Sequence, residues 1–183
     1  MARSPDTAPP GFEESFDVLF SRAFTSAQRL LPSAAASEDV AAEAMMRAYL
    51  HWRKIGEADW REGWVVRVAS NLALDAIRKD KRLDRRRLDE ASAGGSVSGR
   101  LDPDVAESMA LATALGTLPK RQREVVVLRY LEGYPEKDVA AALRISPGSV
   151  KTHASRGLAA MREQLGPDAD RWNDETEAVT AHV

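Results

Sequence analysis

The chain contains no cysteine and only three histidines. Without cysteine there can be no disulfide, thiolate metal site or thiol redox switch within these 183 residues. The histidines, His51, His153 and His182, are far apart in the sequence, and no Gly-rich phosphate loop, metal-ligand cluster or nucleophile–base signature accompanies them. We therefore expect no cofactor and no metal, and we do not expect an enzyme.

Long apolar runs are also lacking. None reaches membrane-spanning length, and the N-terminal segment MARSPDTAPPG has no apolar stretch of the signal-peptide kind. We expect a cytoplasmic protein with no membrane insertion. The formal net charge of −2 argues against a chain that coats nucleic acid indiscriminately, so any nucleic-acid contact must come from local basic patches.

Composition divides the chain into two helical parts, residues 12–87 and 104–165. Residues 88–103, centred on ASAGGSVSG, have the composition of a flexible linker. The Pro-rich segment 1–11 and the acidic segment 166–183 have little to bury, and we predict no fixed structure for them. The predicted fold class is all-α, with two small helical domains joined by a linker.

In the first part, apolar spacings of three and four predict a helix from Glu13 to Leu31, with Phe16 on its apolar stripe. Pro32 ends it. Ser37 is the predicted N-cap of a second helix that runs to about Lys54.

The second helix has two contrasting faces. Its core face is predicted to carry Val40, Ala44 and Tyr49. The opposite face places an apolar Met among charges, and its members are Asp39, Glu43, Met46 and Arg47. This pattern fits a solvated face and a partner-binding surface equally well.

The stretch IGEADWREGW has no period and is predicted to be a loop or an irregular helix. Trp64 then opens a helix with a predicted apolar stripe of Val65, Val68, Leu72, Ala76 and Leu83. The polar residues that face elsewhere are Arg67, Asn71, Asp75, Arg78 and Lys79.

This helix ends in a basic run. From Arg78 to Arg87 there are seven cations and two acids. A helix dipole accounts for a charge or two in the last turn but not for a run across three turns, so we predict contact with DNA phosphates.

After a helix from Asp104 to Leu115 that carries Val105 and Met109, the second part reads as helix, turn, helix. Gly133 ends a helix that begins near Arg123, and Pro135 stands where the next one can start. Small Ala140 suits a close helix crossing, which is typical of helix-turn-helix packing.

A further helix is capped by Ser146 and has Pro147 at its first position. Its buried stripe is predicted to be Val150, Leu158, Met161 and Leu165. Away from that stripe lie donors and cations suited to phosphates and base edges in a major groove, namely Ser149, Lys151, Thr152, Ser155 and Arg156.

Two basic helical parts with these motifs resemble the extracytoplasmic-function group of the sigma-70 family of bacterial RNA polymerase sigma factors. SEDVAAEAMMRAY resembles the family's core-polymerase-binding helix, and WVVRVASNLALDAIRKDKR resembles its minus-ten promoter helix. LPKRQREVVVLRYLEG, with SPGSVKTHASRGLAAMREQL, is similar to its minus-thirty-five reader. The resemblance covers nearly the whole chain except both tails.

The resemblance implies a transcription initiation factor that directs core polymerase to promoters. The β′ clamp coiled coil would meet Asp39, Val40, Glu43, Met46 and Arg47, and the β flap would be a further contact. The minus-ten set would be Asn71, Asp75, Arg78, Lys79, Lys81 and Arg82, with Asn71 at a flipped base and the loop 51–63 forming a pocket. The minus-thirty-five set would be Arg121, Ser149, Lys151, Thr152, Ser155 and Arg156.

The resemblance also implies an anti-sigma protein as a partner and a monomer outside the holoenzyme. The sequence departs from the family at Ala42, where Gln is usual, at Pro135, where a Ser or Thr cap is usual, and at Arg144, where Gly is usual. Two alternatives stay open. One is a LuxR-type regulator, which would require an α/β domain upstream, and the other is a helical protein that sequesters a partner without touching DNA.

Overall fold

The computed structural model describes residues 8–90 and 103–166, which form seven α-helices and one π-helical turn. The first part contains α1 (Phe12–Gln28), α2 (Ala34–Ile55) and α3 (Arg61–Glu90). The second contains α4 (Pro103–Thr117), α5 (Lys120–Val126), the π-turn η1 (Val127–Leu131), α6 (Glu136–Leu143) and α7 (Pro147–Leu165). No strand occurs among the described residues, so the predicted all-α fold class is confirmed. Residues 91–102 of the predicted linker 88–103, and residues 1–7 and 167–183 of the predicted tails, lie outside the described residues. Residues 88–90 belong to α3 and Pro103 to α4, so the linker was predicted too long at both ends.

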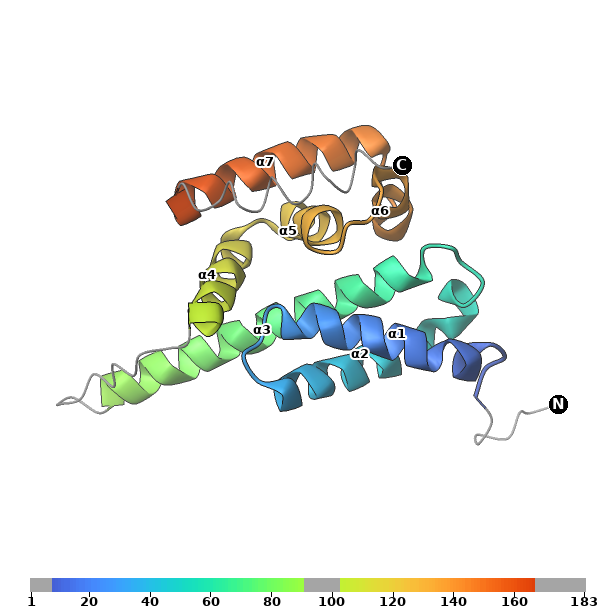
Figure 1. The fold of residues 1–183 in the computed structure, drawn as a ribbon, viewed down its shortest axis with the longest axis horizontal. Helices are drawn as coiled ribbons and strands as arrows, with labels where there is room; N and C mark the ends of the chain where they lie inside the picture. The colour runs from blue at the N-terminus through green and yellow to red at the C-terminus, as the bar shows by residue number, and fades with distance from the viewer. Residues whose placement is uncertain (1–7, 91–102, 167–183) are drawn as a thin grey trace.

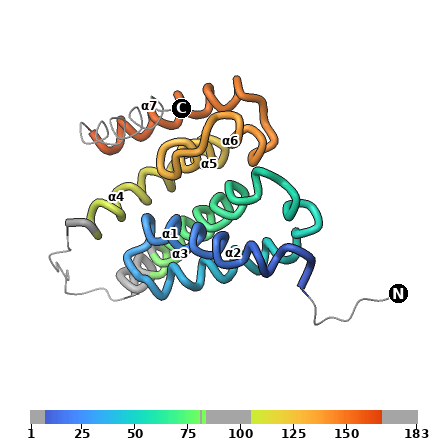
Figure 2. Tube along the Cα trace, turned by 45° about the vertical axis from the view of Figure 1, so that its right-hand side comes forward, coloured from blue at the N-terminus to red at the C-terminus, as the bar shows by residue number. Residues whose placement is uncertain are grey.

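The two parts lie one above the other. Figure 1 shows α1, α2 and α3 as a lower layer and α4 to α7 above them, and Figure 2 shows the same order from another side. The helix α3 contacts α1 and α2 as well as α4, η1 and α6. It is therefore the element on which both parts pack.

The apolar core does not stop at the boundary between the parts. One buried cluster joins residues of α1, α2 and α3 to Leu111, Leu115, Val126 and Met161 of the second part. A second cluster belongs to the helix-turn-helix but includes Val66 of α3, which is 0% exposed. The predicted apolar stripe of α3 did not include Val66, because that side chain is buried only when the second part covers it.

The helix-turn-helix forms with the predicted local chemistry. The Oγ of Ser146 accepts from the backbone N–H of Ser149 at 3.1 Å, and Pro147 occupies the first turn of α7. Gly133 has a φ of 69°, as predicted for the residue that ends the preceding helix. Arg144 has φ 54° and ψ 51°, so a residue with a Cβ holds a left-handed conformation that favours Gly.

Close packing of α7 on α5 depends on Gly157. A Cβ added there would lie 2.7 Å from the Cγ2 of Val126, which is too close for two carbons. The absence of a side chain at Gly157 therefore allows α7 to lie this close to α5.

The predicted cap of the second helix is wrong. Ser33, rather than Ser37, is the N-cap, and its Oγ accepts from the backbone N–H of Ala36 at 3.3 Å. Ala34, Ala35 and Ala36 are strong helix formers, so the helix begins one turn earlier than predicted. Ser37 is buried inside that turn and donates to the carbonyl of Ser33 at 3.0 Å.

Several residues predicted for the core are exposed. Phe12 occupies the buried position between α1 and α2, and the rings of Phe16 and Tyr49 pack edge-on against it while staying 38% and 39% exposed. Leu83 is 40% exposed because the C-terminal end of α3 projects beyond α1 and α2 (Figure 1). Met109 of α4 is likewise 39% exposed.

Candidate nucleic-acid interface

The predicted polymerase-binding face of α2 is exposed. Asp39, Met46 and Arg47 are open to solvent, and Met46 is 53% exposed. Arg47 donates through Nε to Oε1 of Glu43 at 2.8 Å, one helical turn away. Leu50, which was not predicted, extends the apolar part of this surface and is 71% exposed. Val40 is different, because it is buried at 8% exposure in the core of the first part and has almost no surface to offer.

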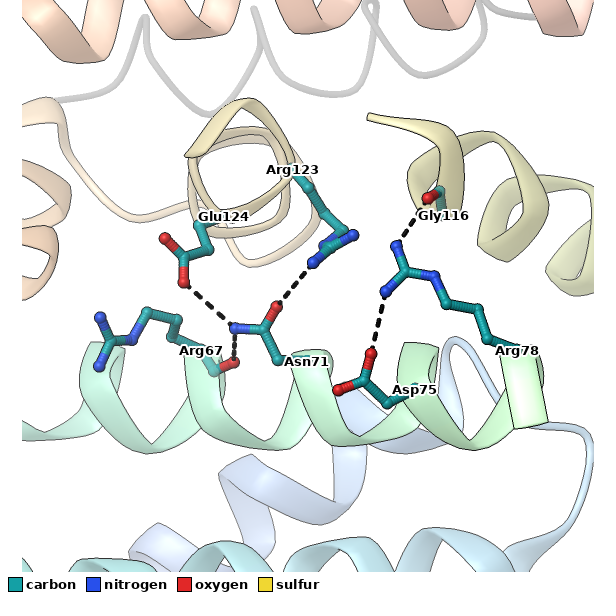
Figure 3. A network of polar contacts seen from close by, with 7 residues as sticks. All are labelled: Arg67, Asn71, Asp75, Arg78, Gly116, Arg123 and Glu124. Carbon is teal, nitrogen blue, oxygen red and sulfur yellow. Dashed lines mark hydrogen bonds and ion pairs between the residues drawn. The ribbon is translucent and has the colours of Figure 1, made fainter. Parts of the chain in front are cut away.

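Three of the predicted minus-ten residues, Asn71, Asp75 and Arg78, lie along the side of α3 that faces the second part. Figure 3 shows Arg67, Asn71, Asp75 and Arg78 on α3, opposite Arg123 and Glu124 on α5 and Gly116 of α4. Arg78 donates to the carbonyl of Gly116 at 2.6 Å and pairs with Asp75 at 2.9 Å. Lys79 and Arg82, further along the helix, are exposed, and Lys81 lies between them in the same helix.

Asn71 stands at the centre of this contact. Its Nδ2 donates to the carbonyl of Arg67 at 2.9 Å and to Oε1 of Glu124 at 3.3 Å. Its Oδ1 accepts from Nη2 of Arg123 at 3.5 Å. Both ends of the amide are therefore engaged by residues of the chain itself (Figure 3).

Burial perturbs the charged groups around Asn71. Desolvation lowers the pKa of Arg67, and the nearby carboxylate of Glu124 works against that shift. The pKa of Arg123 is also lowered by burial, with the neighbouring Arg78 adding to the effect. Arg67 on α3 and Arg123 on α5 are therefore both shielded from water where the two parts meet.

A second polar contact joins α1 to the end of η1. Arg29 pairs with Glu132 at 3.2 Å and also donates to the carbonyl of Leu131. The side chain of Glu132 is only 7% exposed, and burial raises its pKa, an effect that Arg29 opposes. Burial likewise raises the pKa of Tyr134, two residues on, to about 12.

The loop predicted between the second and third helices is shorter than expected. Of the range 51–63 assigned to a pocket, only residues 56–60 lie between α2 and α3. Trp60 in this loop lies under the guanidinium of Arg144, 5.6 Å from the ring centroid. The ring centroids of His51 and Trp64 lie 5.5 Å apart. The guanidinium carbon of Arg67 lies over the Trp64 ring, 5.8 Å from its centroid.

The face of α7 predicted to read duplex DNA is open. Lys151, Thr152, Ser155 and Arg156 are exposed, whereas Val150 and Met161 on the other side of the helix are buried. Ser149 is half-buried and shares a hydrogen bond with the capping Ser146 at 2.8 Å. Arg121 lies on α5 and donates to Oε2 of Glu124 at 2.9 Å, so it belongs with the contact to α3.

The sequence interpretation did not include Arg123, Glu124, Arg29 or Glu132. Arg123 and Glu124 are 7% and 3% exposed. They immediately precede the buried run of Val125, Val126 and Val127 and share its helix. Two charges directly beside such a run are the signal that could have identified them, because a solvated helix face rarely abuts three consecutive buried residues.

The chain matches two family models. The model of Sigma-70 region 2 matches residues 20–83, and that of Sigma-70, region 4 matches residues 108–161. Hereafter the part formed by α1 to α3 is called region 2 and the part formed by α4 to α7 is called region 4.

Similar proteins agree with these matches. The ECF RNA polymerase sigma factor SigW of Bacillus subtilis is 30% identical over 167 residues, which cover 84% of this chain and 88% of that protein. The RNA polymerase sigma-E factor of Streptomyces avermitilis is 31% identical over 156 residues, with 84% of each chain covered. Among solved structures, the sigma factor RpoE of Bartonella quintana, crystallised with the anti-sigma factor NepR, superposes with a TM-score of 0.51 at 19% identity over 86% of this chain and 98% of that one, which supports the fold.

A helix-turn-helix whose last helix has an open polar face is the architecture of DNA-binding transcription proteins, and the second part of this all-α chain has it. The chain belongs to the extracytoplasmic-function group of the sigma-70 family. It is a transcription initiation factor that directs RNA polymerase to promoters. The LuxR-type alternative is not supported, because the first half is the helical region 2 and not an α/β domain.

Proposed function

We propose that three surfaces of this chain divide the work of promoter recognition. The first is the α2 face of Asp39, Glu43, Met46 and Arg47, which would bind the β′ clamp coiled coil of core polymerase. Its support is the exposure of an apolar Met46 between charged neighbours, a composition suited to a protein contact. The buried Val40 would support this face from beneath.

The second surface is the side of α3 that carries Asn71 and Arg78, together with the basic end of the helix. Asn71 offers an amide that can both donate to and accept from a base edge, and the cations from Arg78 to Arg82 suit the phosphates of a single strand. Capturing one unstacked base costs a few kcal/mol, which contacts in the site must offset. We assign minus-ten recognition and strand capture to this surface.

The third surface is the open face of α7, and it supplies the observation that carries the proposal. Its exposed side presents Lys151, Thr152, Ser155 and Arg156, while its other side is fixed by burial on α5 and α6. A rigidly held helix with hydroxyls and cations on one face fits a major groove. We assign duplex recognition of the minus-thirty-five element to it, with region 4 meeting the β flap.

The chain is proposed to act without catalysis of its own, in the cytoplasm, as a monomer until it joins core polymerase. No helix among the described residues has the length and apolarity to cross a membrane. An anti-sigma protein is proposed as its regulator, because these 183 residues contain no cysteine with which to sense redox state.

Reconstitution tests the proposal. Core polymerase, with and without the purified chain, would transcribe sheared genomic DNA of the source bacterium, and the 5′ ends of the transcripts would be sequenced. We expect start sites that depend on the chain and share two upstream elements. A partner-sequestering protein would give no such transcripts, and their absence would refute the proposed function.

A further inference from the structure

We propose that region 4 covers the minus-ten face of α3 in the free chain, so that the two regions must separate before a promoter strand can reach Asn71. This inference rests on the proposed role of α3 in minus-ten recognition. It assigns an autoinhibitory function to the contact between the regions.

The hydrogen bonds of Asn71 leave no room for a base. Its Nδ2 and Oδ1 are both engaged, with Glu124 at 3.3 Å and Arg123 at 3.5 Å. A nucleobase that used the same amide would have to replace two side chains of α5. Arg78 is tied to α4 as well, through the carbonyl of Gly116 at 2.6 Å.

Charge makes the competition sharper. The carboxylate of Glu124, with a side chain only 2% exposed, lies beside Arg67 and Arg121 on the face proposed to bind DNA. A phosphate brought to this face would meet a buried negative charge that already engages the local cations. Glu124 thus occupies the place that an anionic strand needs, and the two cannot be bound together.

Apolar residues of region 4 also pack over α3. Val66 of α3 is enclosed by residues of region 4 that include Val125, Leu128 and Val139. Gly63, at the start of α3, is buried close to Ala142 and Tyr134. The contact therefore extends along α3 from its first turn to Arg78. This stretch includes Asn71, Asp75 and Arg78, the first three residues of the proposed minus-ten set.

The same contact has features of one that can be released. Three of its buried polar atoms have no hydrogen-bond partner among the described residues, namely Nε of Arg123, Oε1 of Glu132 and Oη of Tyr134. These three atoms are buried without a hydrogen bond while the regions are closed, although the other carboxylate oxygen of Glu132 pairs with Arg29. Separation of the regions would return them to water. Polymerase binding therefore needs less free energy to separate the regions than it would if every buried polar group of the contact were hydrogen-bonded.

The two DNA-reading surfaces are consequently in different states. The recognition face of α7 is exposed, while Asn71 and Arg67 on α3 lie under region 4. The closed chain can reach duplex DNA through α7 but cannot take up a single strand through α3.

A reversible covalent lock tests the inference. A Cβ at position 63 would lie 3.4 Å from the Cβ of Ala142, close to the separation found in disulfides. Because the chain has no native cysteine, Gly63→Cys combined with Ala142→Cys introduces its only two thiols. Ala142 is not among the proposed DNA-binding or polymerase-binding residues, but Gly63 is the last residue of the range 51–63 that the family resemblance assigns to a pocket. The two single variants and the reduced double variant therefore serve as controls, since they carry the same substitutions without the crosslink.

The double variant would be oxidised, its free thiols counted, and its transcription with core polymerase compared before and after dithiothreitol. We expect the oxidised chain to lose promoter-dependent transcription, to keep its affinity for minus-thirty-five duplex, and to recover transcription on reduction. Equal transcription by the oxidised and reduced forms would overturn the inference and leave the proposed function intact. Failure of the folded double variant to form the disulfide would also overturn the inference. If the reduced double variant and the wild type were both inactive, that result would instead refute the proposed function on which the inference rests.

Discussion

Asn71 and Glu124 lie 53 positions apart in the sequence, and the amide of the first donates to the carboxylate of the second at 3.3 Å. The bond joins α3, the helix proposed to capture the minus-ten strand, to α5, which packs against the proposed minus-thirty-five reader α7. A residue assigned to a promoter base is therefore held, in the free chain, by an acid of the other region. Because this hydrogen bond must break before Asn71 can bind a base, it couples minus-ten recognition by region 2 to the position of region 4.

Reversal of the charges on α2 tests the polymerase-binding surface. The double variant Asp39→Arg, Glu43→Arg should lose co-purification with core polymerase, because two attractive charges become repulsive while the buried face of α2 is unchanged. Circular dichroism should show the helical content of the wild type. The variant Glu57→Arg, exposed in the short loop after α2, is the control and should bind normally. Retained binding by the double variant would contradict the assignment.

Removal of the Asn71 amide tests strand capture. In the holoenzyme, where the closed contact is proposed to be open, Asn71→Ala should impair strand opening more than formation of the closed promoter complex. The physical reason is that the amide would bind the base only after it leaves the stack. Permanganate reactivity of thymines in the promoter bubble measures this step. An unchanged bubble with the variant would show that Asn71 has another role.

Two cations on α7 should act differently. A guanidinium can pair bidentately with a guanine edge, whereas an ammonium is a point charge suited to phosphate. Arg156→Ala should cost about 1–3 kcal/mol on the preferred minus-thirty-five duplex and little on scrambled DNA. Lys151→Ala should weaken both duplexes and lower the salt slope by roughly one unit.

Binding titrations of both variants on matched and scrambled duplexes at several salt concentrations separate the two roles. Both side chains are exposed, and Lys151 reaches only a 4.0 Å contact with Glu136, so neither change should disturb the fold. Equal losses on both duplexes for Arg156→Ala would rule out base reading by that residue.

Glu132 should make the stability of the closed chain depend on pH. Its pKa is raised above the ordinary value of 4.5, chiefly by burial, with Arg29, Ser26 and Arg22 opposing the shift. The closed state therefore holds the proton more tightly than the unfolded or open state. Stability from this group is present below pH 4.5 and is lost as the pH rises through the raised pKa.

Thermal unfolding of the wild type and Glu132→Gln, measured from below pH 4.5 upward, isolates the contribution of Glu132 to stability. The wild type should lose stability relative to the variant as the pH rises, because only the wild type must bury a charge beside Tyr134. The exposed Glu14→Gln on α1 is the matched control and should follow the wild type. A stability difference that stays constant, or grows in the opposite direction, would contradict the role of Glu132.

Local patterns predicted most of the fold. The cap at Ser146, the positive φ of Gly133 and the buried side of α7 follow from short-range chemistry and were predicted from the sequence. The cap of α2 was mispredicted because Ser33 and Ser37 are both good caps, and the intervening alanines decided between them. Such errors displace an element by one turn without changing the fold.

The contact between the regions could not be predicted in the same way. Val66 lies off the stripe that faces α1 and α2, and Arg123 and Glu124 have the charges of ordinary surface residues. Their burial comes from a partner surface more than fifty residues away, which no local period encodes. The sequence therefore indicated which residues suit DNA but not which of them the free chain covers.

Binding of two DNA probes to the free chain tests the central claim most directly. With the promoter known from transcript mapping, fluorescence anisotropy would compare a minus-thirty-five duplex with a single-stranded minus-ten probe, for the wild type and for Arg29→Ala. That variant leaves the buried Glu132 without its ion-pair partner and should favour separation of the regions, while Arg53→Ala on α2 serves as control. We predict that the wild type and the control bind the duplex but not the single strand, and that Arg29→Ala binds both; strong binding of the single strand by the free wild-type chain would contradict the claim that region 4 covers Asn71.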